Sequence, residues 1–156
     1  MKSPEKLRAE ILPLSSSQMW LEACLEWSLI DIHINEDTET CLCGHNPIVE
    51  ICIIKNRVTK NIARVGNHCV HNFMGLASRG LFGSIRRIMD DSCASLSEDV
   101  IHELSSWKTI TSWERDFYLD ILRKRKLSER QREIKTQINE KVLAHVLRRH
   151  YGSVYA

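Results

Sequence analysis

The first third of the chain alternates short apolar stretches with polar breaks. Apolar residues recur at helical spacing over 17–27, which predicts a first helix with serines available to cap its start. The β-branched stretch 29–34 predicts a strand with Ile30, Ile32 and Ile34 on one face, and the polar stretch 35–40 predicts a connector. We expect a short helix and a strand here.

A second pattern follows this connector. Residues 48–55 and 61–65 predict two strands, and the polar stretch 56–60 between them is typical of a hairpin turn, although it lacks glycine. After Gly66 and Asn67, residues 69–74 predict the start of another helix. The middle of the chain is therefore expected to be a β-hairpin that leads into a helix.

From about residue 81 the apolar period becomes helical. Three pairs have the spacing of a capping box, which marks a helix start: Ser95 and Glu98, Thr111 and Glu114, Ser128 and Gln131. Four aromatic residues lie at spacings that favour core packing: Trp107, Trp113, Phe117 and Tyr118. We expect a bundle of about four helices.

The composition is that of a globular protein. The 156 residues are 43% hydrophobic and 27% charged, and no apolar run is long enough to cross a bilayer. The charged N-terminus has no apolar signal segment, which favours a cytoplasmic protein without membrane contact. We expect an α+β fold, with a zinc-ribbon-like β-hairpin module over 15–76 packed with a helical bundle over 81–151.

The strongest chemical signal is a cluster of cysteines. Four of the six cysteines and three of the seven histidines fall within 41–69 and its flank. In a reducing compartment such a cluster indicates zinc more often than disulfides. Cys41 and Cys43 form a C-x-C pair, and Cys69 follows the predicted hairpin, as in a zinc ribbon. We expect these three cysteines to bind a structural Zn²⁺ ion.

The fourth zinc ligand is open between two main candidates. His45 lies two residues beyond Cys43, and its second ring nitrogen could bond to a backbone carbonyl. Cys52 lies inside a predicted strand, where a buried structural thiol is an equally natural role. His68 and His71 are further alternatives. A solvent ligand, which a catalytic site would need, is disfavoured because sulfur-rich closed sites are usually structural.

The stretch 41–73 resembles a module of small, mostly uncharacterised bacterial and phage proteins. Its pattern is approximately C-x-C-G, then an isoleucine and often a cysteine, then I-x-N-x-x-T, and then V-G-x-x-C followed by an aromatic residue. It is matched here by Cys41, Cys43, Gly44, Ile48, Cys52, Ile54, Asn56, Thr59, Val65, Gly66, Cys69 and Phe73. Lys60 departs from the pattern, because a glycine is common after the threonine. The resemblance spans about 20–151 and implies a zinc-binding module with a helical partner, but no reaction.

Positive charge is concentrated near the C-terminus. The net charge of the chain is only +2, yet residues 123–149 hold ten Lys or Arg and three Glu, or about +7. The candidate phosphate-contacting residues are Arg123, Lys124, Arg125, Lys126, Arg130 and Lys135. A solvated helix surface or contact with an acidic protein would explain the same charges.

These features together predict a non-enzymatic zinc-binding adaptor or regulator that binds nucleic acid or a nucleic-acid-processing complex. One alternative is a phage-type inhibitor directed at a protein target in a host defence complex, such as an anti-CRISPR. Another is a small HNH-like nuclease, which His68, His71 and Asn72 suggest. The nuclease is less favoured because thiolates suit a structural zinc ion better than a hard catalytic cation.

Overall fold

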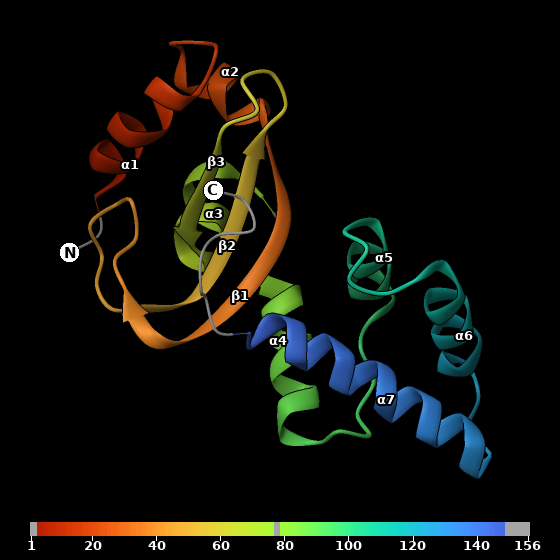
Figure 1. Cartoon of the computed structure of the whole chain (residues 1–156). Helices are drawn as coiled ribbons and strands as arrows, with labels where there is room; N and C mark the ends of the chain where they lie inside the picture. The colour runs from red at the N-terminus through yellow and green to blue at the C-terminus, as the bar shows by residue number, and fades with distance from the viewer. Residues whose placement is uncertain (1–2, 77–78, 149–156) are drawn as a thin grey trace. The chain divides into compact units, whose positions relative to one another are not determined.

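In the computed structural model, which describes residues 3–76 and 79–148, the N-terminal half of the chain is built on a three-stranded antiparallel sheet (Figure 1). The strands are β1 (Trp27–Glu39), β2 (Ile48–Asn56) and β3 (Ile62–Gly66), in the order β1-β2-β3. The predicted hairpin is confirmed, with Cys52 opposite Val65 in the register of β2 and β3. The α+β class is confirmed as well.

Strand β1 is longer than the sequence predicts. The expected connector over 35–40 is mostly strand, since β1 continues to Glu39, which pairs with Ile48 after an irregularity that begins at Ile34. Glu39 is held by its pairing with Ile48, while residues 35–38 lie in the irregularity between this pair and the pair of Ile34 with Glu50. A second shift between Leu29 and Asp31 breaks the expected alternation.

The burial of β1 follows from this shift. Ile32 and Ile34 are buried as expected, but the alternate residues Asp31 and His33 are also buried, while Ile30 is half-buried. The Asp31 carboxylate accepts a hydrogen bond from the Arg148 guanidinium at 2.8 Å, and Arg148 also donates to the carbonyl of Ile32. A buried charge on β1 is thus balanced by a cation from far along the chain.

Three α-helices and one 3₁₀ turn accompany the described sheet. They are α1 (Pro4–Ile11), η1 (Leu12–Leu14), α2 (Trp20–Leu25) and α3 (Asn67–Met74). The sequence analysis missed α1, although Ser3 caps it by accepting the Lys6 N–H and Pro4 occupies its first turn. The helix predicted over 17–27 is shorter, because Trp27 already belongs to β1. Helix α3 confirms the prediction and contacts β2 and β3.

The turn between β2 and β3 is built without glycine. The side-chain oxygen of Asn56 accepts the N–H groups of Val58 and Thr59, at 2.8 and 2.9 Å. Lys60 has φ = 67°, in the left-handed region that favours glycine. Lys60 therefore replaces the expected glycine at the very position whose backbone is left-handed.

The second half of the described chain holds four helices, as predicted: α4 (Arg79–Asp90), α5 (Glu98–Ser106), α6 (Ser112–Leu122) and α7 (Glu129–Val146). Thr111 and Glu114 form both hydrogen bonds of a capping box at α6. Ser128 and Gln131 form the same reciprocal pair before α7. The third predicted box is wrong, because Ser97 is the N-cap of α5 and the Ser95 hydroxyl instead accepts from Lys135.

The interior of the helical half contains a polar network. Tyr118 and Asn139 have no exposed surface, and the Tyr118 hydroxyl donates to the Asn139 side chain at 2.7 Å while accepting the Leu96 N–H. Burial raises the pKa of the Tyr118 hydroxyl. Trp113, predicted to be a core residue, is 62% exposed and stacks on Phe117 instead.

The described residues separate into two compact units. The sheet unit comprises residues up to Arg79 together with Leu147 and Arg148, and the helical unit comprises Gly80–Val146. The sequence assigned 147 and 148 to the helical bundle, whereas they group with the sheet; residues 149–151 of that predicted domain lie outside the described residues. None of the described helices has the length and apolar character needed to cross a membrane.

Candidate metal centre

The sheet brings the three predicted zinc ligands to one end of the sheet unit. Strands β1 and β3 both run antiparallel to β2, so they run parallel to each other and leave the sheet on the same side. Cys41 and Cys43 lie in the loop that follows β1, and Cys69 lies in the first turn of α3, directly after β3. The fold therefore joins ligands that are 26 to 28 residues apart in the sequence.

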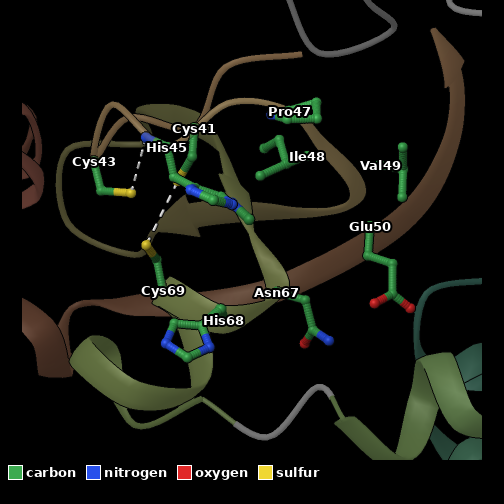
Figure 2. A pocket seen from close by; sticks show the side chains of 11 residues that line it. Cys41, Cys43, His45, Pro47, Ile48, Val49, Glu50, Asn67, His68 and Cys69 are labelled. Atoms are coloured by element: carbon green, nitrogen blue, oxygen red, sulfur yellow. Dashed lines mark hydrogen bonds between the residues drawn. The ribbon is translucent and has the colours of Figure 1, made fainter. Parts of the chain in front are cut away.

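The three sulfur atoms face one another (Figure 2). All three lie within 4.8 Å of each other, and the Sγ atoms of Cys41 and Cys69 are 3.6 Å apart. Two sulfurs bound at about 2.3 Å to one tetrahedral ion lie about 3.8 Å apart. Each cysteine is at most 3% exposed. The thiols thus form a buried group with the separations that a single metal ion requires.

Backbone donors point at two of these sulfurs. The N–H of Gly66 donates to the Cys41 sulfur at 3.3 Å, and the N–H of His45 donates to the Cys43 sulfur at 3.4 Å. The loop reaches this shape because Gly44 has φ = 90° and its N–H bonds to the carbonyl of Cys41. Such donors stabilise thiolates, the form in which cysteine binds metal.

The ionisation of the cluster follows from these contacts. The hydrogen bond that Cys41 shares with Cys69, followed by backbone N–H donors such as that of Gly66, lowers the pKa of Cys41 to about 5. The same shared proton, together with burial, raises the pKa of Cys69. A bound cation would favour the thiolate form of all three sulfurs.

The candidates for the fourth ligand lie at different distances from this group. His45 and His68 are exposed and line the same pocket as the three sulfurs, although neither ring belongs to the close cluster. The His68 ring bonds to Asn72 at 2.6 Å. His71 is exposed on α3 and does not line this pocket. Cys52 is fully buried within β2, outside both the cluster and the pocket lining.

The pocket wall also contains residues that the sequence analysis did not select. Glu50 and Asn67 line it together with His68 (Figure 2). Glu50 belongs to β2, and its register position opposite Ile34 was not predictable without the strand pairing. No spacing signal in the sequence marks these residues, because they reach the pocket through the pairing of strands and the start of α3.

Of the predicted phosphate-contacting residues, the structure brings four together. Arg123, Lys124, Arg125 and Lys126 follow one another between α6 and α7, and all four are exposed. We call this segment the basic loop. Lys124 pairs with Asp120 at 3.6 Å. For the other three, no carboxylate partner is found among residues 3–76 and 79–148.

Arg130 and Lys135 behave differently from the basic loop. Arg130 pairs with Glu133 on the surface of α7 at 3.2 Å. The Lys135 ammonium donates to Ser95 at 2.7 Å, and partial burial lowers the pKa of Lys135. These two cations are engaged within the helical unit, so the basic loop is the stronger candidate for contact with an external anion.

Comparison of the chain with protein-family models, curated proteins and solved structures finds no match. The resemblance of residues 41–73 to the bacterial and phage module stays a prediction, and the chemistry of the site rests on its geometry.

Proposed function

We propose that Cys41, Cys43 and Cys69 bind one Zn²⁺ ion that closes the end of the sheet unit. The observation that carries this proposal is the convergence of three buried sulfurs within 4.8 Å. Thiolates of this kind suit zinc, which has no redox chemistry and accepts tetrahedral sulfur ligands. The ion would tie the loop after β1 to the start of α3, so its role is structural.

His45 is proposed as the fourth ligand. It follows Cys43 by two residues, its backbone N–H already bonds to the Cys43 sulfur, and its side chain lines the pocket beside the cluster. Its exposed ring is able to change rotamer without disturbing a packed core. Cys52 would need β2 to leave its register, which pairs Cys52 with both Ile32 and Val65.

The function proposed for the whole chain is that of a non-enzymatic adaptor that contacts the phosphate backbone of nucleic acid. The basic loop supports this role, because three of its four exposed cations have no carboxylate partner in the part of the chain described. Cations on a short loop can approach phosphates without losing ion pairs within the protein. The proposal requires no reaction at the metal, consistent with a sulfur-rich ligand set.

The test measures binding of labelled DNA and RNA oligonucleotides over a range of salt concentrations. Each phosphate contact contributes about 0.9 to the slope of log K against log salt on duplex DNA. Changing all four residues of the basic loop to Gln is expected to reduce that slope by about 3. The doubly conservative variant Arg123→Lys/Arg125→Lys keeps the charge and should retain the slope.

Two results would overturn the nucleic-acid proposal. One is the absence of wild-type binding at low salt, and the other is equal binding by the wild type and the Gln variant. Neither result would bear on the metal site, which is tested separately by the zinc content of the wild type and of Cys69→Ser. Zinc in equal amount in both proteins would contradict the assignment of Cys69.

A further inference from the structure

Large apolar side chains are exposed in one part of the sheet unit. Leu21 is 81% exposed, Leu25 72%, Met19 66% and Val58 62%. In the described chain the other exposed large apolar residues are Trp113 at 62% and Val49 and Met89 at 39%, and none of them lies on these segments. We call Leu21, Leu25 and Val58 the α2 patch. Soluble proteins seldom leave such a group uncovered unless it binds a partner.

The geometry of the chain holds this patch together. Leu21 and Leu25 are four residues apart in α2, so their side chains lie on one face of the helix. The turn that bears Val58 is fixed to the end of α2, because the Arg57 N–H donates to the carbonyl of Glu26 at 2.7 Å and its guanidinium donates to the carbonyl of Leu25. Figure 1 shows α2 beside the turn between β2 and β3.

The segment under the patch is ordered by polar contacts that leave the apolar groups exposed. The Glu26 carboxylate accepts the N–H groups of Ser16 and Ser17 and the side-chain amide of Asn56, which lowers the pKa of Glu26. Ala23, on the opposite side of α2, is fully buried. Because this segment is already ordered in the free protein, little of its conformational entropy would be lost when a partner binds.

Exposed cations border the patch on the side of the turn. Arg57 and Lys60 are exposed on either side of Val58, and the Arg8 guanidinium lies 5.4 Å from the ring centre of Trp20, the first residue of α2. Glu22 and Glu26 keep their negative charge on the helix side, where Glu26 accepts hydrogen bonds and Glu22 accepts from the Ser17 hydroxyl, so the cationic border is confined to the turn. An apolar surface with a cationic border complements an apolar surface with an anionic border.

We propose that the α2 patch docks an amphipathic helix of another protein, whose apolar face is flanked by carboxylates. The three side chains expose on the order of 300 Å², less than half of the 800 Å² that each subunit of an ordinary dimer contributes. This area suits a single helix with anchors at i, i+3, i+4 and i+7, and it is small for a second copy of this chain. The proposal concerns the sheet unit and does not depend on nucleic-acid binding.

The test selects ligands from a displayed library of random 16-residue peptides on the purified full-length protein. Enriched sequences are expected to carry apolar residues at helical spacing and an excess of Asp and Glu. Affinity of a selected peptide for Leu21→Gln/Leu25→Gln is expected to fall about tenfold or more, since two exposed anchors are lost. Glutamine retains helix propensity, so α2 should remain folded. Met89→Gln, which changes an exposed apolar residue of α4, is the matched control and should bind normally.

Charge provides a second measurement on the same peptide. Lys60→Gln is expected to weaken binding two- to threefold at low salt and to have less effect at high salt, because the cation acts through Coulomb attraction. The proposal is overturned if the selected peptides do not depend on Leu21 and Leu25, or if they are predominantly basic. It is also overturned if light scattering shows a dimer of the wild type that Leu21→Gln/Leu25→Gln abolishes.

Discussion

The two units of the chain differ in how their main buried polar cluster is satisfied. In the helical unit, Tyr118 and Asn139 satisfy each other and the backbone around Leu96, so the network is complete within the protein. In the sheet unit, the three thiols at the end of the sheet meet mainly one another. The Tyr118–Asn139 network is satisfied by hydrogen bonds alone, whereas the cysteine cluster needs a bound cation. The two units should therefore respond differently to loss of metal and to single substitutions.

Metal removal is expected to produce the largest difference between the two units. A structural zinc ion contributes on the order of 10 kcal/mol to the folding of small sites, so a strong chelator should expose the backbone amides of 41–45 and 66–69. Amides of α5, α6 and α7 should keep their protection. Hydrogen–deuterium exchange with mass spectrometry measures both regions in one sample, and re-addition of zinc should restore protection. Equal loss in both units would contradict the separation drawn here.

The next largest effect is expected at the buried carboxylate of β1. Asp31 is 2% exposed and bonds to Arg148, so Arg148→Ala leaves a buried charge without that cation. We expect the free energy of unfolding to fall by about 3 kcal/mol, measured by urea denaturation. Arg148→Lys retains the charge but loses the double contact with Asp31 and the Ile32 carbonyl. Its free energy of unfolding should therefore lie between those of the wild type and Arg148→Ala. A loss below 0.5 kcal/mol in Arg148→Ala would show that this pair does not support the sheet unit.

The polar network of the helical unit gives a smaller expected change. Tyr118→Phe removes the hydroxyl and leaves the Leu96 N–H and the Asn139 side-chain oxygen without that partner, which should cost about 2 kcal/mol. The zinc content should stay unchanged, because the network lies entirely in the other unit. Trp113→Phe, at an exposed position of the same helix, serves as the control and should change stability little. Loss of zinc from Tyr118→Phe would contradict the independence of the two units.

The smallest effect is a gain in stability at the hairpin turn. Lys60 has φ = 67°, and Lys60→Gly removes the strain on its Cβ at the cost of a more flexible unfolded chain. We expect a net stabilisation of about 0.5 kcal/mol in the same urea experiment. Lys60→Ala keeps the Cβ and should show no such gain. Destabilisation by glycine would mean that the lysine side chain contributes contacts that outweigh its backbone strain.

The sequence predicted the helical unit best because its signals are local. Thr111 and Glu114, or Ser128 and Gln131, lie within one helical turn of each other, and the helix starts follow from that spacing. The Ser95 signal failed because Ser97 competes for the same helix start, and Ser95 is held by Lys135, forty residues away. Helix α1 also has a local start signal, in Ser3 and Pro4.

Features that depend on pairing between distant strands were harder to predict from the sequence. The extension of β1 through polar residues to Glu39 requires knowledge of its pairing with Ile48. The cysteine spacing indicated Cys41, Cys43 and Cys69, yet it did not separate His45 from Cys52, because the distinction depends on the register of β2. The exposure of the α2 patch had no signal either, since Leu21 and Leu25 have the spacing of an ordinary core-facing helix.

X-ray absorption at the zinc edge tests the central claim most directly, because it reports the metal and its ligands in one measurement on the purified protein. The account predicts one zinc ion with three sulfur ligands at about 2.3 Å and one nitrogen ligand at about 2.0 Å. A zinc-free protein, or a zinc shell of nitrogen and oxygen without sulfur, would contradict it.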